Sequence, residues 1–440
     1  MRSLDRLTPS RCRTLAPALL ALAAWASSPV AAGPDPPKAP PPAPAPAHPL
    51  PGFPPGTKPP VQLTPARPAQ CAPVGSLPAG EAVPAERILR DLREGKNVQL
   101  KGALIEGNLD FDLDSPPPAD ERRFSLRVIT GLLRLESCRV AGRVAFRRTV
   151  FLQGLEMPCT EIRGDLDLGE ADLPALVAPH LHVIGPVRLG GIGTGDDIDL
   201  SGAVLDDRLE VGGRIRGGMR LGGAELRGGM EMTRAVVDEI DLTFAKASAP
   251  VRLQDLLVLS DLEARDGTFA RGLSLEAVRV GGDADFDDTR SPAGITLAGF
   301  ALSGDLGLAL AGETPLTMTD VDVRGDLSLF DGRLGALVMD RVKVFGDTEF
   351  ESCRFPGKVT IRDTDFGAEF SADEAAFLGD CEFRHVRFPG ADPMAGVRFA
   401  RAPTLVDTTL PVPPTVEGEG DGSGGEDEDL DFQDVAAPEK

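Results

Sequence analysis

Large aromatic side chains are scarce in this sequence of 440 residues, which has one tryptophan, no tyrosine and 5% aromatic residues overall. A chain of this length could form two or three ordinary globular domains. Each such domain would usually need more aromatic residues to fill its core. The sequence has 50 glycines and 40 prolines instead. This composition argues against globular domains and favours many small, thin cores.

Long apolar runs are missing as well. The run near the start, residues 15–26, lies between a basic beginning and the small residues 30–32. It is too short to span a hydrocarbon core of about 30 Å, and the three parts together are typical of a cleaved export signal. We therefore expect residues 1–32 to be a signal peptide. The mature chain should be exported, periplasmic or extracellular, without a transmembrane segment.

Both ends of the mature chain have compositions that cannot pack a core. Proline dominates residues 33–84, which predicts an extended, disordered linker. Residues 401–440 end in a glycine-rich and strongly acidic stretch, which predicts a disordered acidic tail. The net charge of −22 also argues against binding to nucleic acid or to anionic lipid.

Between these ends an apolar residue recurs every 10 or 11 positions. A second apolar series runs about five residues behind the first, with lapses at Thr194, Ser291 and Gly312. This spacing fits neither a helix nor a long strand, and it predicts a chain that turns after each short face. Glycine often stands four positions before the first series, where we expect tight corners of positive φ.

Four such faces would make one coil of about 21 or 22 residues, stacked on the next coil about 4.8 Å away. We expect residues 98–400 to form a β-solenoid of about 12–13 coils on this spacing. Residues 85–97 begin with an amphipathic segment that has proline before it and glycine near its end. This segment predicts a short helix that caps the first coil.

The segment AERILRDLREGKNVQLKGALIEGNLDF, residues 85–111, resembles the opening of many bacterial pentapeptide-repeat proteins. The F-x-x-x-x-F spacing of Phe350 and Phe355 is also similar, whereas the A-(D/N)-L consensus is matched fully at residues 171–173 alone. The resemblance covers about residues 85–400. It implies an all-β fold, a right-handed four-sided parallel β-helix with a short N-terminal capping helix.

Catalytic and metal-binding patterns are few. The sequence has four histidines and no Ser/His/Asp set, HExxH or P-loop, so we expect no enzyme and no cofactor. His180 and His182 could be half of a metal site or two surface residues. Gly190–Gly195 reads as a loose corner, because no phosphate-binding helix follows it. The Gly-Asp pairs at 164, 282, 304, 325 and 346 fit either turn chemistry or a calcium-binding ladder.

Cysteine and phenylalanine give two structural expectations. Cys71, Cys138, Cys159, Cys353 and Cys381 would remain after export, and Cys138 and Cys159 lie about one coil apart. We predict a disulfide between those two, with buried thiols elsewhere. The second apolar series ends in a column of core phenylalanines, predicted to stack in adjacent coils: Phe355, Phe366, Phe377, Phe388 and Phe399.

Three functions remain open at this point. The first is a non-enzymatic structural or binding rod of the cell envelope or exterior, whose flat faces dock an unknown protein or a cell-wall polymer. The second is a DNA mimic that binds topoisomerases, as the family resemblance implies for some members; the acidity suits it and the export signal argues against it. The third is a carbohydrate-active β-helix enzyme, for which no acid pair stands out.

Overall fold

A computed structural model describes residues 71, 81–111, 127–390, 392–410 and 415–416 of the chain. The expected signal peptide, most of the proline-rich segment and most of the acidic tail lie outside these residues. Among the described residues, no helix is long and apolar enough to cross a membrane.

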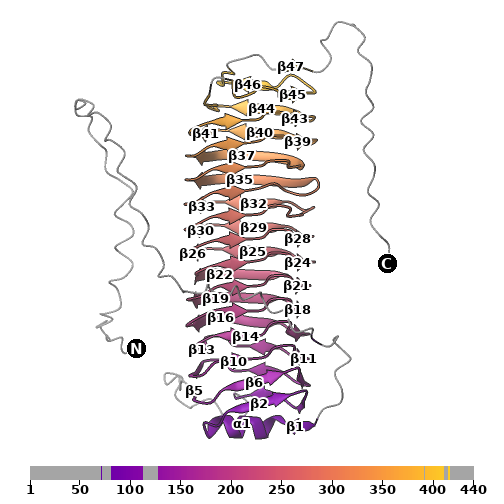
Figure 1. Ribbon diagram of the computed structural model, residues 1–440, viewed down its shortest axis with the longest axis vertical. Helices are drawn as coiled ribbons and strands as arrows, with labels where there is room; N and C mark the ends of the chain where they lie inside the picture. The colour runs from indigo at the N-terminus through magenta and orange to yellow at the C-terminus, as the bar shows by residue number, and fades with distance from the viewer. Residues whose placement is uncertain (1–70, 72–80, 112–126, 391, 411–414, 417–440) are drawn as a thin grey trace, which may run out of the picture. The chain divides into compact units, whose positions relative to one another are not determined.

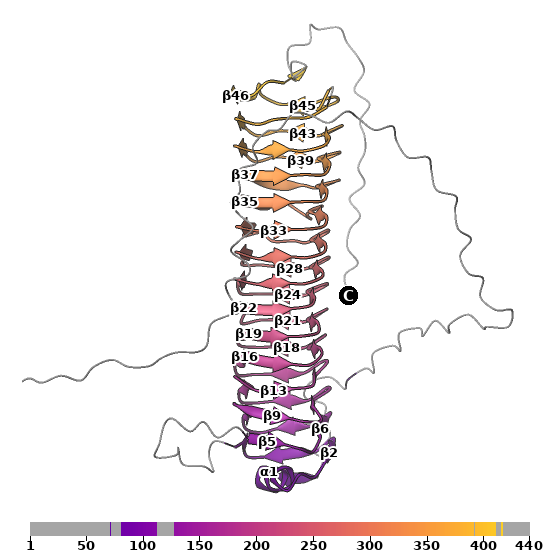
Figure 2. The same cartoon turned by 90° about the vertical axis from the view of Figure 1, so that its left-hand side faces the viewer.

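One turn of the chain makes four short faces. β14 (Leu176–Val177) belongs to a 13-stranded sheet and β15 (His182–Val183) to a nine-stranded sheet. β16 (Val187–Thr194) then bends across two faces of a 21-stranded sheet, before β17 (Ile198–Asp199) returns to the 13-stranded sheet. Each strand pairs in parallel with its equivalent one turn later. The expected four-sided parallel β-helix is confirmed, and Figures 1 and 2 show its turns stacked along one axis.

The interior of the solenoid is filled by the two apolar series. Nearly all of their members line one continuous buried core from Val83 to Phe399, whereas Ile184, predicted to face inward, is exposed and its neighbour Val183 is buried instead. Two of the expected lapses are also buried, because their polar atoms find backbone partners. Ser291 donates its hydroxyl to the carbonyl oxygens of Phe269 and Gly294, at 3.1 and 2.7 Å, and Thr194 donates to the carbonyl of Asp196 at 2.7 Å. A hydroxyl satisfied in this way can replace an apolar residue without leaving an unpaired buried group.

The N-terminal end of the core is covered by α1 (Ala85–Arg93), as the sequence predicts. Its residues Ala85, Ile88, Leu89 and Leu92 are buried, and it lies across the indigo end of the rod in Figure 1. Glu86 near its start and Arg93 near its end complement the helix dipole. The helix therefore closes an end of the rod that would otherwise expose apolar side chains.

The solenoid extends beyond both predicted limits. β1 (Ala82–Pro84) pairs with β3 (Leu104–Glu106), so the last residues of the expected linker are a strand. β46 (Thr404–Val406) pairs with β44 (Cys381–Arg384), inside the expected tail. The rod has about 14 turns rather than 12–13. The sequence does not predict these end strands. One side of each has no neighbouring coil, so the apolar period fades there.

Candidate functional site

The 13-stranded sheet presents a face crowded with carboxylates. One column of acids stands immediately before its strands from β17 to β42 (Phe370–Ser371), and we call it the corner column. A second column lies on the outward position of several of the same strands. The corner column consists of Asp197, Glu239, Asp261, Asp283, Asp305, Asp326, Asp347 and Glu369. The second column consists of Asp199, Asp241, Glu263, Asp285 and Glu349, and the two columns together are the acidic face.

The corner column is held by hydrogen bonds between coils. The backbone N–H of Asp283 donates to Oδ1 of Asp261 at 2.8 Å, and that of Asp305 donates to Oδ1 of Asp283 at 2.9 Å. The same bond recurs from Asp326 to Asp305 and from Asp347 to Asp326, at 2.8 Å each. Each carboxylate therefore fixes the next coil with one oxygen and keeps the other available at the surface.

The glycine before four of these aspartates has a different role from the predicted one. Gly282, Gly304, Gly325 and Gly346 do not have the positive φ that we expected there. They are needed because the aspartate of the preceding coil lies directly against them: a Cβ at Gly304 would overlap Oδ1 of Asp283 and lie 2.6 Å from the carbonyl oxygen of Gly282. The Gly-Asp pair is thus a packing unit between coils.

Replacing one of these glycines should destabilise the rod locally. We expect Gly304→Ala to lower the free energy of unfolding by about 1–3 kcal/mol, the usual cost of forcing an extra methyl group into a packed site. Gly190→Ala is the matched control, because a Cβ there would meet nothing within 4 Å, and it should stay within about 0.5 kcal/mol. Chemical denaturation of the two variants measures the difference. Equal stabilities would contradict the packing role.

Few cations neutralise the acidic face. Over the described strands from β17 to β42, its cations are Arg220, which pairs with Asp197 at 2.8 Å, and Arg265, which pairs with Asp285 at 2.7 Å. Partial burial, and then the charge of Glu263, raises the pKa of Glu239 above its usual value. Burial likewise raises the pKa of Asp287, next to the face. At Glu239, the charge of a neighbouring carboxylate therefore adds to the effect of burial on the pKa.

The acidic face has no arrangement of acids suited to a bound metal. Within the described ranges, no three His, Cys, Asp or Glu side chains are grouped to hold one ion. Of the Gly-Asp pairs, those at 282, 304, 325 and 346 share one corner, whereas Asp165 precedes β12 (Leu166–Asp167) on the 21-stranded sheet. The observed hydrogen bonds agree with turn chemistry between coils.

The two histidines considered as half of a metal site occupy different positions in the fold. His182 lies on β15, and its Nε2 is 3.0 Å from Oδ2 of Asp206. His180 has a φ of 55° at the preceding corner. The two rings therefore do not extend side by side from one strand.

The C-terminal phenylalanines stack in two columns on different faces. Phe355, Phe377 and Phe399 lie on β39 (Arg354–Phe355), β43 (Ala376–Phe377) and β45 (Arg398–Phe399). Their ring centroids are 4.6 and 5.0 Å apart, with interplanar angles of 11°. Phe366 and Phe388 stack on the other face, at 5.6 Å. Aromatic pairs of this kind stabilise a core beyond simple burial.

Further phenylalanines, outside the predicted column, pack against these two columns. Phe383 meets Phe377 edge to face at 6.3 Å, and Phe370 meets Phe388 at 4.9 Å. Phe350 packs on Phe355 at 5.9 Å. The C-terminal core is therefore a connected aromatic cluster rather than a single ladder.

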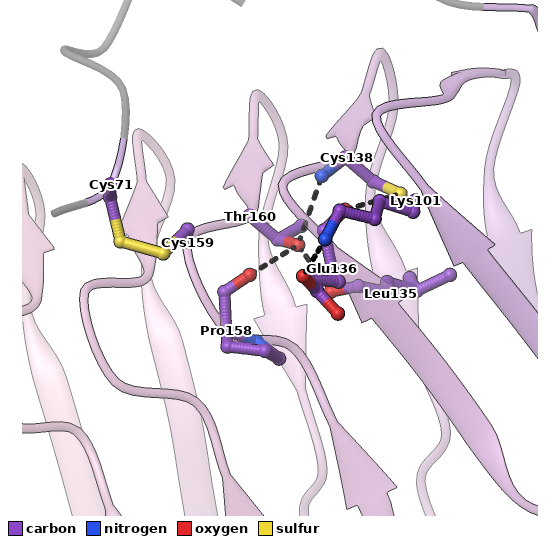
Figure 3. The surroundings of a disulfide bond; sticks show 8 residues. All are labelled: Cys71, Lys101, Leu135, Glu136, Cys138, Pro158, Cys159 and Thr160. Carbon is purple, nitrogen blue, oxygen red and sulfur yellow. Dashed lines mark hydrogen bonds and ion pairs between the residues drawn. A yellow bond between two sulfur atoms is a disulfide. The ribbon is translucent and has the colours of Figure 1, made fainter. Parts of the chain in front are cut away.

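The predicted disulfide between Cys138 and Cys159 is wrong. Cys159 is bonded to Cys71, with Cα atoms 5.6 Å apart, and Cys138 is a buried free thiol (Figure 3). The register explains the error: Arg139 pairs with Glu161, so the residue stacked on Cys138 is Thr160. Cys159 stands one position earlier, at a corner with a φ of 54°, and is accessible to a partner from outside the rod.

The remaining cysteines are enclosed by the core. Burial raises the pKa of the Cys353 and Cys381 thiols to about 12, and burial also raises the pKa of Cys138. Thiols of this kind are unreactive because the thiolate is scarce at neutral pH. Of the five cysteines expected to remain after export, two therefore form one surface disulfide and three are buried thiols.

Comparison with protein-family models, with curated proteins and with solved structures found no match for this chain. The fold is shown by the structure itself. Membership in the pentapeptide-repeat family rests on the sequence resemblance and stays a proposal.

Proposed function

We propose that this chain is an exported, non-enzymatic β-solenoid of the pentapeptide-repeat kind that docks a cationic partner on its acidic face. The observation that carries the proposal is the near-continuous corner column of carboxylates between β17 and β42, flanked by the second column on several of these strands, with Arg220 and Arg265 as the described cations of the face. A rigid surface that bears one sign of charge attracts and orients an oppositely charged partner. The partner class we favour is a protein with a lysine- or arginine-rich segment.

Two features support the export that this proposal includes. The first is the basic, apolar and small-residue order of residues 1–32. The second is the bond between Cys71 and Cys159, since structural disulfides persist mainly in oxidising compartments. Location in the cell envelope or outside the cell would give the rod access to partners there.

The acidic face also favours a second candidate, a polynucleotide mimic that occupies the DNA site of a topoisomerase. Carboxylates repeated at the coil spacing could replace backbone phosphates in a basic channel. The two candidates differ in location, because the target of the mimic is cytoplasmic. Fractionation of cells that express the full chain separates them: protein in the periplasm or medium supports the first candidate and argues against the second.

Neutralising the acidic face should weaken binding to a basic probe without unfolding the rod. For Asp283→Asn, Asp305→Asn and Asp326→Asn combined, we expect affinity for an octalysine peptide to fall about tenfold or more at low salt. Asparagine keeps the Oδ1 that accepts the N–H of the next coil, so the fold should survive. Fluorescence anisotropy over a range of salt concentrations measures the change.

The control carries the same charge change on the 21-stranded sheet. Glu276→Gln and Asp322→Asn remove exposed carboxylates from its strands, and Asp255→Asn removes one at the corner directly after β25 (Val251–Gln254). This variant should bind octalysine nearly as well as the wild type, because its acidic face is intact. Equal losses in both variants would mean that net charge alone attracts the peptide, and the docking face would be refuted.

A further inference from the structure

Away from the acidic face, two neighbouring coils carry hollows where side chains are missing. β16 and β19 (Leu209–Ile215) cross the corner between the two faces of the 21-stranded sheet, and both contain paired glycines. One hollow of about 500 Å³ has Gly193 and Gly195 in its lining. A second, of about 620 Å³, is lined in part by Gly190, Gly191 and Gly212. Figure 1 shows β16 and β19 stacked on each other.

The first hollow has one cationic side. Arg214 and Arg216 stand on the coil after Gly193 and Gly195, at matching positions, because Gly193 pairs with Arg214. Both side chains are exposed, and neither guanidinium forms an ion pair or hydrogen bond with another described side chain. Arg234 lines the second hollow together with Glu210 and with Glu231, which pairs with Arg208, and Arg234 itself is without an ion pair in the described part of the chain. Two unpaired arginines therefore border the first hollow, and a third borders the second.

The opposite side of the first hollow is largely apolar, and the exposed carboxylate of Asp172 lies between that side and Gly193. Val150, Leu152 and Pro174 line it, and Leu152 is 56% exposed although it is a large aliphatic residue. The glycine floor lets a ligand approach the backbone closely. A suitable occupant therefore has carboxylates for the arginines and a flat C–H surface for Val150, Leu152 and Pro174.

We propose that these hollows bind a carboxylated oligosaccharide that lies along β16, with its uronate groups on Arg214, Arg216 and Arg234. A sugar ring has an apolar C–H face and can carry its carboxylate at the edge, which matches the two sides of the first hollow. The arginines are too exposed for one small ion to bind well, because solvent screens each contact. A chain of two or three charged rings engages several arginines at once and gains from multivalency. The site is on a different face from the acidic columns and does not depend on the proposed function.

The test measures binding of tri-galacturonate to the full chain by isothermal titration calorimetry. We expect saturable binding by the wild type and at least about tenfold weaker binding by Arg214→Ala combined with Arg216→Ala. Gly193→Ile keeps both arginines and fills the hollow; the three atoms nearest to a Cβ there belong to the Asp172 side chain and the Ala171 carbonyl, at 3.2 Å or more. This variant should lose binding to a similar extent while it keeps its folded stability.

The control variant combines Arg279→Ala and Arg324→Ala. Both arginines are exposed, Arg279 on β30 (Arg279–Val280) of the same sheet and Arg324 directly after β35 (Thr314–Val323), and they lie away from the two hollows. It should bind like the wild type. The proposal is overturned if the wild type does not bind tri-galacturonate, if the control variant loses as much affinity as the hollow variant, or if Gly193→Ile binds normally. The proposal would also be overturned if inorganic phosphate bound the site as tightly as tri-galacturonate does, since a simple anion would then be the ligand.

Discussion

Replacing Phe377 by alanine should loosen the C-terminal coils while the N-terminal coils stay intact. Phe377 is 1% exposed and stacks between Phe355 and Phe399, at centroid distances of 4.6 and 5.0 Å. Loss of a buried phenylalanine costs about 3–5 kcal/mol through lost burial and the cavity that remains. Because coils contact only their neighbours, the loss should stay local. Hydrogen exchange followed by mass spectrometry should show faster exchange in β37 (Leu334–Val344) to β45 than in β16 to β22 (Met230–Val237).

The matched control is Phe345→Ala, which removes the same side chain from the surface of the same end. Phe345 is 60% exposed, so its removal leaves no cavity. Its effect on exchange and on thermal unfolding should stay within about 0.5 kcal/mol. If Phe377→Ala exchanges like the wild type, the aromatic columns do not hold the C-terminal coils together.

The fold could be predicted because its determinants are local and repeated. The apolar period of five or six residues fixes the length of each face, and the residues at Phe355, Phe377 and Phe399 fall on one face because each coil there has 22 residues. The capping helix carries its own start and stop residues. The ends of the solenoid were less predictable, because β1 and β46 have few neighbours to impose the pattern.

The acidic face was present in the sequence and was overlooked. An acid-x-acid pattern recurs at Asp197, Glu239, Asp261, Asp283 and Asp347, a whole number of coils apart. The Gly-Asp pairs alone do not connect the second acid of each pattern to the first. Comparing each coil position by position would have placed both acids on one face, because neighbouring coils align residue on residue.

The other errors depend on contacts that periodicity does not encode. The role of Gly304 arises from the Asp283 side chain of the preceding coil, which a turn rule for single glycines cannot anticipate. The bond between Cys71 and Cys159 joins residues 88 positions apart, one of them outside the repeat. The hollows beside β16 come from missing side chains on adjacent coils. The glycine-rich residues 190–195 do not themselves indicate that arginines lie next to them on the following coil.

Opening the disulfide should destabilise the N-terminal coils and leave the C-terminal ones unchanged. The bridge joins Cys71 to a corner just before β11 (Glu161–Ile162) and closes a loop that contains the capping helix and the first coils. On a chain-entropy model a loop of this length stabilises the folded state by up to about 4–5 kcal/mol. For Cys71→Ser combined with Cys159→Ser, we expect faster hydrogen exchange from β2 (Val98–Lys101) to β7 (Arg139–Val140).

Reductant provides the control for this experiment. It should reproduce the effect of the double substitution in the wild type and have no effect on the double variant. The buried thiols should not interfere, because burial holds the pKa of Cys353 and Cys381 at about 12 and keeps them unreactive. Mass mapping of the oxidised protein should find Cys71 joined to Cys159. A bridge to Cys138, or faster exchange at the C-terminal coils upon reduction, would contradict the role given to this bond, since the loop it closes ends at β11.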